Sequence, residues 1–212
     1  VLAQKTAGDL MAEFDKASSL KERVDICYSI SIYYSSRLKV DSALFFANKI
    51  KEISTPTNYE SGFAKYYFAT GAALKMRRKT GEAITNLNKA ISIFTKEKDH
   101  LFLGKTYRTF ASVYVLDGNY DLARENYRLA IANSAIAGDD NVLIREYEEA
   151  ASVFSRALDN DSAIIYLTKG LAIAEKIKHQ GSIFLLAGSL GILFLDGGDL
   201  YKARYFLEYS FK

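Results

Sequence analysis

The sequence is poor in the residues from which many functional sites are built. Its 212 residues include one cysteine, two histidines, one proline and no tryptophan. One cysteine forms neither an internal disulfide nor a thiolate cluster for a metal ion. One proline, together with the lack of runs that alternate polar and apolar residues, leaves little room for β-strands. These absences favour a helical fold without a disulfide framework.

The charge and the hydrophobic pattern exclude two further classes of protein. The chain has 28 Lys and Arg against 25 Asp and Glu, which gives a net charge of +3. Such a weak and evenly spread charge does not favour nucleic acid as the main partner. No apolar run reaches the roughly 20 residues that a membrane-spanning helix requires. Apolar residues nevertheless make up 49% of the chain, which is enough for a substantial core.

A 40-residue repeat organises the sequence. Alanine recurs five times at this spacing, and an apolar residue follows each alanine four positions later. A small residue lies twelve positions before each alanine, and a large residue lies three positions after the small one. The alanines are Ala43, Ala83, Ala123, Ala163 and Ala203, and the small residues are Ser31, Gly71, Ala111, Ala151 and Gly191. The pattern predicts a close contact between two helices in every copy.

The apolar spacing within a copy predicts two helices joined by a short turn. In the third copy, Tyr107 and Tyr114 would share one face of the first helix. Residues 117–119, Asp-Gly-Asn, would form the turn, since glycine lets the backbone reverse and asparagine can cap the next helix. Copies one and four lack this glycine and have Lys39 to Asp41 and Asn160-Asp161 in its place.

The third copy resembles a tetratricopeptide repeat (TPR). The residues that carry the resemblance are Tyr107, Phe110, Ala111, Tyr114, Gly118, Tyr120, Ala123, Tyr127 and Ala130. The resemblance implies an all-α fold, a superhelix or solenoid of about five stacked helix pairs. The usual TPR period is about 34 residues, so each copy here is about six residues longer.

The resemblance also predicts the domain organisation. We expect one solenoid domain over residues 1–212, with an N-terminal helix in residues 1–20, formed by Thr6 to Ser18. The repeats would cover about 21–60, 61–100, 101–140, 141–180 and 181–212, the last of them truncated.

In TPR proteins the first helices line a groove that binds a peptide or a protein segment. Carried over position by position, the resemblance assigns to this groove Tyr28, Lys65, Phe68, Lys105, Arg108, Ser112, Arg145 and Glu148. Lys65, Lys105 and Arg145 would form a basic row that suits a peptide with acidic side chains or a free carboxylate. The alternative is a solvated helix face with ordinary Lys and Arg.

Each candidate motif for a catalytic or metal site in the sequence lacks a required residue. Gly104-Lys105-Thr106 imitates the end of a phosphate-binding loop, but Asp99 replaces its earlier glycine. Residues 117–121 imitate a calcium loop, but Leu122 occupies the place of its glycine. His100 and His179 have no spaced partner and indicate helix entries. We therefore expect no cofactor, no metal and no enzymatic activity in this segment.

Two further groups of polar residues have ordinary interpretations. Glu146, Glu148 and Glu149 are typical of a solvated helix face rather than of an acid–base pair. Cys27 occupies a core position and is expected to be a small buried residue rather than a nucleophile.

The two ends of the sequence suggest a larger protein. Val1 and Ala3 stand where the small residues of a signal-peptidase site would lie, which favours export over a start at an arbitrary residue. The fifth copy is apolar almost all round, so we expect that further chain follows or that this end self-associates.

Together these features resemble the extracytoplasmic repeat segment of bacterial TPR-containing two-component sensor histidine kinases. That resemblance implies a sensory or scaffolding module in a periplasmic location, with a kinase domain elsewhere in the full protein. The alternatives are a cytoplasmic peptide-responsive regulator and a structural assembly subunit.

Overall fold

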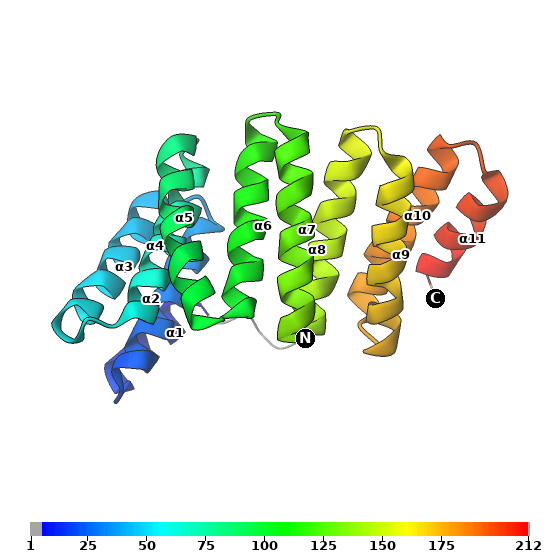
Figure 1. Cartoon of the computed structure of the whole chain (residues 1–212). Helices are drawn as coiled ribbons and strands as arrows, with labels where there is room; N and C mark the ends of the chain where they lie inside the picture. The colour runs from blue at the N-terminus through cyan, green and yellow to red at the C-terminus, as the bar shows by residue number, and fades with distance from the viewer. Residues whose placement is uncertain (1–5, 212) are drawn as a thin grey trace. The chain divides into compact units, whose positions relative to one another are not determined.

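A computed structural model describes residues 6–211, and its regular structure is entirely helical (Figure 1). The α-helices are α1 (Ala7–Lys16), α2 (Leu20–Ser35), α3 (Val40–Ser54), α4 (Glu60–Met76), α5 (Thr80–Glu97), α6 (His100–Leu116), α7 (Tyr120–Ala137), α8 (Asp140–Arg156), α9 (Asn160–Lys176), α10 (Gln180–Asp196) and α11 (Leu200–Ser210). A short 3-10 helix, η1 (Thr55–Thr57), follows α3. The all-α prediction is confirmed.

The chain divides into two compact units, and each is described by itself. The N-terminal unit ends at Phe102 and the C-terminal unit begins at Leu103. Every expected repeat interval holds one first helix and one second helix, while the grouping of the repeats into a single domain stays a prediction. Residues 1–3, interpreted as a signal-peptide remnant, lie outside the described residues. None of the described helices is long and apolar enough to cross a bilayer.

The connections between helices recur every 20 residues. From position 38 to position 198, each connection places one residue in the left-handed region, with φ between 50° and 81°. These residues are Leu38, Asn58, Arg78, Lys98, Gly118, Gly138, Leu158, Lys178 and Gly198. A left-handed residue that is not glycine costs roughly 1–2 kcal/mol. The helix pairs of copies one and four therefore form without the turn glycine, but with backbone strain at Leu38 and Leu158.

The close helix contact predicted for each copy is present. In the first copy, the Ser31 hydroxyl donates a hydrogen bond of 2.7 Å to the backbone carbonyl of Ala43 on the partner helix. In the second, a β-carbon on Gly71 would lie 2.8 Å from the Leu87 side chain, a distance that real β-carbons do not show. Small residues are therefore required at this position because the two helices touch there.

Each unit has its own apolar core. In the N-terminal unit, Val24, Cys27 and Ile50 are buried together. In the C-terminal unit, Phe154 and Leu190 belong to a larger cluster that extends from α6 to α10. The prediction that Cys27 is a small buried core residue is confirmed, and burial raises the pKa of its thiol to about 11.

Candidate functional site

In the N-terminal unit, the face of α2 and α4 carries a partly buried ion pair. Lys65 on α4 is only 5% exposed and pairs with Asp25, which lies 40 residues earlier on α2. The Lys65 ammonium also lies 5.1 Å from the centre of the Phe102 ring, within the range of a cation–π contact. The repeat thus brings equivalent positions of successive first helices into contact.

Aromatic rings surround this pair. The Tyr28 ring centre lies 5.9 Å from that of Phe68 and 5.2 Å from that of Phe102, and the second contact is edge-to-face. Phe94 stacks on Phe102 from the other side, with the ring centres 5.0 Å apart. Of the two predicted groove residues, Tyr28 lines this face, whereas Phe68 is 3% exposed and belongs to the core. Phe102 was not predicted, because it lies at the start of α6 outside the positions carried over from the family.

A cavity of about 490 Å³ opens beside these residues. It is lined by Lys21, Asp25, Tyr28, Ser29, Tyr59, Ser61, Lys65, Asp99 and Phe102. Its walls offer aromatic faces together with charges of both signs. Such a lining can hold a peptide segment, since rings contact apolar side chains and charged groups fix orientation.

In the C-terminal unit, the equivalent face is dominated by charge. Arg108 on α6 forms ion pairs with two carboxylates of α8, through Nε to Glu146 at 3.3 Å and through Nη1 to Glu149 at 3.0 Å. The Tyr127 hydroxyl donates a hydrogen bond of 3.3 Å to Glu149. One guanidinium therefore links α6 to two acids of α8, and the Tyr127 hydroxyl joins α7 to one of these acids.

The interpretation of the α8 glutamates as a solvated face is wrong for Glu146. This side chain is 0% exposed, and neither of its oxygens accepts a hydrogen bond from the described residues. Burial raises the pKa of Glu146 to about 8, and neighbouring Arg108 opposes the rise. The sequence could not reveal this, because a glutamate in a buried ion pair and a glutamate in water are the same residue in the sequence.

A second cavity, of about 430 Å³, lies between α8 and α10 of the C-terminal unit. Glu148, a predicted groove residue, lines it together with Ala151, Ser152, Ser155, Arg156, Leu167, Ser189, Ile192, Leu193 and Asp196. Each unit thus has a cavity on the face formed by its first helices.

The remaining predicted groove residues have different environments. Arg145 is exposed on α8, and Lys105 is half-buried on α6. The Ser112 hydroxyl donates to the Arg108 carbonyl at 3.0 Å, which is a bond within its own helix. Since Lys65 belongs to one unit and Lys105 and Arg145 to the other, a continuous basic row stays a prediction.

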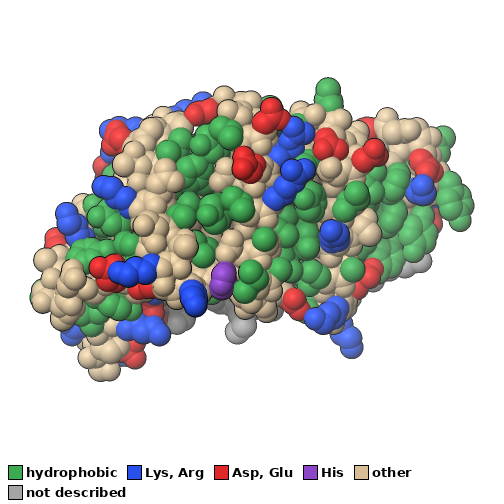
Figure 2. Space-filling view, viewed as in Figure 1, with side chains coloured by type: hydrophobic (Ala, Val, Ile, Leu, Met, Phe, Trp, Pro, Cys, Tyr) green, Lys and Arg blue, Asp and Glu red, His purple; other side chains and the backbone are tan. Residues whose placement is uncertain are grey.

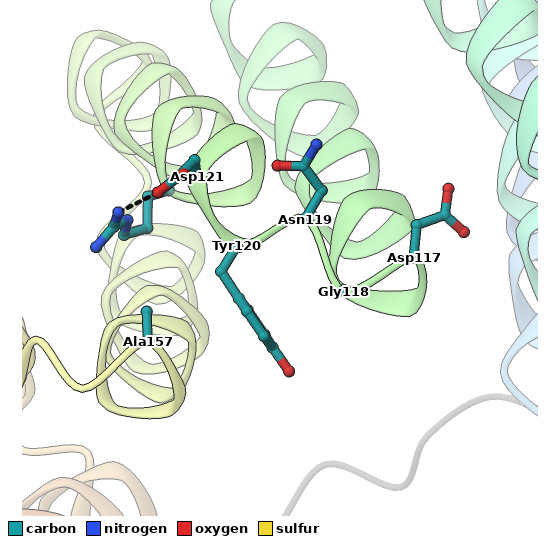
Figure 3. Close-up of a pocket in the computed structure, with 7 residues that line it drawn as sticks. Asp117, Gly118, Asn119, Tyr120, Asp121 and Ala157 are labelled. Atoms are coloured by element: carbon teal, nitrogen blue, oxygen red, sulfur yellow. Dashed lines mark hydrogen bonds and ion pairs between the residues drawn. The ribbon is translucent and has the colours of Figure 1, made fainter.

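The sequences that imitate a phosphate loop and a calcium loop have structural roles. Gly104 lies inside α6, where a β-carbon would come within 2.4 Å of the Ser134 hydroxyl of α7. Asp117 and Asp121 point away from one another, and Asp121 is paired with Arg124 (Figure 3). No group of three potential metal ligands occurs within residues 6–211. The turn therefore has the geometry of a helix connection.

The fifth copy has an exposed apolar surface, as the sequence indicated. Figure 2 shows hydrophobic side chains gathered over the C-terminal end, where α10 and α11 lie. The exposed residues of these two helices are Phe184, Leu185, Ile192, Leu195, Leu200, Tyr201 and Tyr205. An exposed patch of this kind is typical of a surface that contacts another molecule.

Comparison with known proteins identifies the repeat type. A family model described as tetratricopeptide repeat matches residues 67–136. No curated protein matches the chain.

Several solved structures share the fold. Aspartyl phosphate phosphatase F from Bacillus subtilis is 16% identical with a TM-score of 0.72, over 98% of this chain and 55% of that one. The Rap conjugation gene regulator of plasmid pLS20, solved in complex with the Phr* peptide, is 14% identical with a TM-score of 0.68, over 95% and 64%. The TPR-like repeats of a putative kinesin light chain from Podosopora anserina are 16% identical with a TM-score of 0.66, over 92% and 95%. The chain therefore has an all-helical fold of the TPR type, and residues 67–136 carry the repeat in their sequence.

Proposed function

We propose that this chain is a non-catalytic module that binds an extended peptide or protein segment along the first helices of its repeats. The observation that carries the proposal is the position of the two cavities. One is lined by α2, α4 and the start of α6, and the other mainly by α8 and α10. Both lie on first helices, the first along the N-terminal halves of α2 and α4 and the second along the C-terminal halves of α8 and α10, so each unit offers a binding place on this face.

The chemistry of these cavities suits a peptide. Aromatic rings and apolar side chains alternate with a few charged groups, which is the usual composition of a specific binding site. The solved neighbour in complex with the Phr* peptide shows that a chain of this fold can hold a peptide. Arg145, exposed on α8, and Lys105 are the residues that we expect to face an acidic group of the ligand.

We further propose that the module is the sensory or scaffolding segment of a larger signalling protein. The extracytoplasmic setting rests on the sequence resemblance to sensor kinases. The peptide bound to the Rap regulator is compatible with the alternative of a regulator that responds to a peptide. The exposed apolar residues of α10 and α11 favour self-association as a second role of the same chain.

A displayed library of random linear peptides, selected on the intact chain, tests the proposal. Arg145→Glu is the informative variant, because Arg145 is exposed and its replacement leaves the core intact. Lys178→Glu is the matched control, since Lys178 lies exposed in a turn between α9 and α10. Lys65 is unsuitable, since a glutamate at this buried position would face Asp25.

We expect selected peptides to bind the wild-type chain and the control, and to bind Arg145→Glu several-fold more weakly. Failure to select any peptide, or selected peptides that bind Arg145→Glu as tightly as the wild-type chain, would contradict the proposed function.

A further inference from the structure

The cavity between α8 and α10 differs from its counterpart in the N-terminal unit. Its walls include the apolar side chains of Ala151, Leu167, Ile192 and Leu193. No aromatic ring lines it, and it has no internal ion pair of the kind that Lys65 and Asp25 form. At about 430 Å³ it is large enough to receive one large apolar side chain.

The charged groups at this cavity do not balance. Glu148, Arg156 and Asp196 line it, which gives two negative charges and one positive. Arg156 is exposed, whereas Glu148 is half-buried in the wall. Arg156, the one cation of the lining, forms no ion pair with Glu148 among the described residues, so a cation that arrives with the ligand would stabilise this acid.

The neighbouring charges strengthen this asymmetry. Three glutamates lie on this part of α8, and the only guanidinium paired with them among the described residues, that of Arg108, serves Glu146 and Glu149. Burial raises the pKa of Glu148, and the adjacent Glu149 raises it further, while Arg145 opposes the rise. Glu148 is thus the one of these three glutamates that no described cation pairs with.

We propose that the α8–α10 cavity recognises a peptide in which a large aliphatic side chain is adjacent to a lysine or arginine. The aliphatic side chain enters between Leu167, Ile192 and Leu193, and the cation pairs with Glu148 at the wall. This inference rests on the proposed function and names the ligand class for the C-terminal unit. It adds a basic determinant to the acidic group expected opposite Arg145 and Lys105.

A charge exchange between chain and peptide tests the proposal. Peptides selected on the wild-type chain from the random library are resynthesised with a fluorophore, and their binding is measured by fluorescence anisotropy. The variant is Glu148→Lys, and the matched control is Glu125→Lys, which changes an exposed glutamate on the second helix α7. Ser152→Trp, at an exposed position that lines the cavity, tests the space itself.

We expect the selected peptides to share an aliphatic residue next to a basic one. Glu148→Lys should weaken their binding about fivefold to tenfold, and a peptide with its basic residue changed to glutamate should recover most of the loss. Ser152→Trp should weaken binding at least as much, and Glu125→Lys should leave it unchanged. Circular dichroism confirms that every variant remains folded.

Two results separate this inference from the proposed function. If peptides are selected and respond to Arg145→Glu but not to Glu148→Lys or Ser152→Trp, the peptide-binding function stands and the α8–α10 ligand class is wrong. If Glu148→Lys weakens binding but the charge-exchanged peptide recovers nothing, the cation pairing is likewise wrong.

Discussion

The two units build the same helix pairs with different polar chemistry. In the N-terminal unit, the first helices meet through one lysine–aspartate pair beside aromatic rings, and Asp25 keeps 41% of its side chain exposed. In the C-terminal unit, one arginine is shared by two glutamates, of which Glu146 is fully buried. The helical scaffold therefore tolerates very different groups on this face, so the repeat fixes where a side chain lies but not its chemistry.

The largest difference between the units should follow removal of each central cation. Above pH 8, where Glu146 is ionised in the folded chain, Arg108→Met leaves this buried charge without its cation, and breaking a buried pair in this way typically costs about 3–5 kcal/mol. Lys65→Met leaves Asp25 near water and should cost only about 1 kcal/mol. Urea unfolding, combined with hydrogen exchange measured for each unit, tests the contrast.

The double variant Arg108→Met/Glu146→Leu provides the control for this prediction. It removes both members of the pair together, so it should recover a large part of the free energy of unfolding lost in Arg108→Met. Equal losses for Lys65→Met and Arg108→Met would show that the two units depend on their ion pairs to the same extent.

The pH dependence of stability should also distinguish the units. Because the pKa of Glu146 rises from 4.5 to about 8 in the folded chain, the folded state holds a proton that the unfolded state releases. The contribution of Glu146 to the free energy of unfolding is therefore largest below pH 4.5 and falls as the pH rises to about 8. For one proton the slope reaches at most about 1.4 kcal/mol per pH unit.

Hydrogen exchange between pH 5 and pH 8 measures this slope separately for amides of each unit. The Glu146→Gln variant keeps the shape of the side chain and removes its titration, so it should flatten the slope in the C-terminal unit only. A wild-type slope of the same size in the N-terminal unit would contradict the assignment to Glu146, since no carboxylate of that unit's described residues is fully buried.

Backbone strain in the turns should have a smaller effect on stability, and one substitution can remove strain while another adds it. Leu158 lies at φ 60°, whereas Gly118 lies at φ 73° at the equivalent position of the preceding repeat, where an added β-carbon would meet only open space. Leu158→Gly should therefore stabilise the C-terminal unit, and Gly118→Ala should destabilise it, each by about 1 kcal/mol. Thermal unfolding measures both changes, and a destabilising Leu158→Gly would indicate that the leucine side chain contributes more than its strain costs.

Much of the fold could be predicted from the sequence because small residues recur at a fixed spacing of 40. Ser31 and Gly71 hold positions where two helices touch, and no large side chain fits there, so the spacing is visible in one-letter code. The site could be predicted only in part. Tyr28 and Phe68 follow from the register of the first helix, but the burial of Lys65 and Glu146 depends on partners 40 and 38 residues away.

Helix capping gives the smallest difference between the units. In the C-terminal unit, each of α7 to α11 is preceded by a residue whose side chain accepts a hydrogen bond from a backbone N–H of the first turn. These capping residues are Asn119, Asp139, Asp159, His179 and Asp199. In the N-terminal unit, Lys39, Tyr59 and Lys79 precede α3, α4 and α5 without such a bond. These three helices therefore leave backbone donors of the first turn to water.

Lys39→Asp should supply the missing cap of α3 and stabilise the N-terminal unit by about 0.5–1 kcal/mol, and Asp159→Ala should destabilise the C-terminal unit by a similar amount. Lys39 is the informative position because Asp159 occupies the equivalent position of the fourth repeat. The Asp159 carboxylate accepts a hydrogen bond of 3.1 Å from the Ser162 N–H. Urea midpoints of the two variants against wild type measure the effect. If Lys39→Asp has no effect while Asp159→Ala destabilises, the turn at Leu38 does not present its backbone donors as the turn at Leu158 does, and the two units differ in loop geometry as well as in capping.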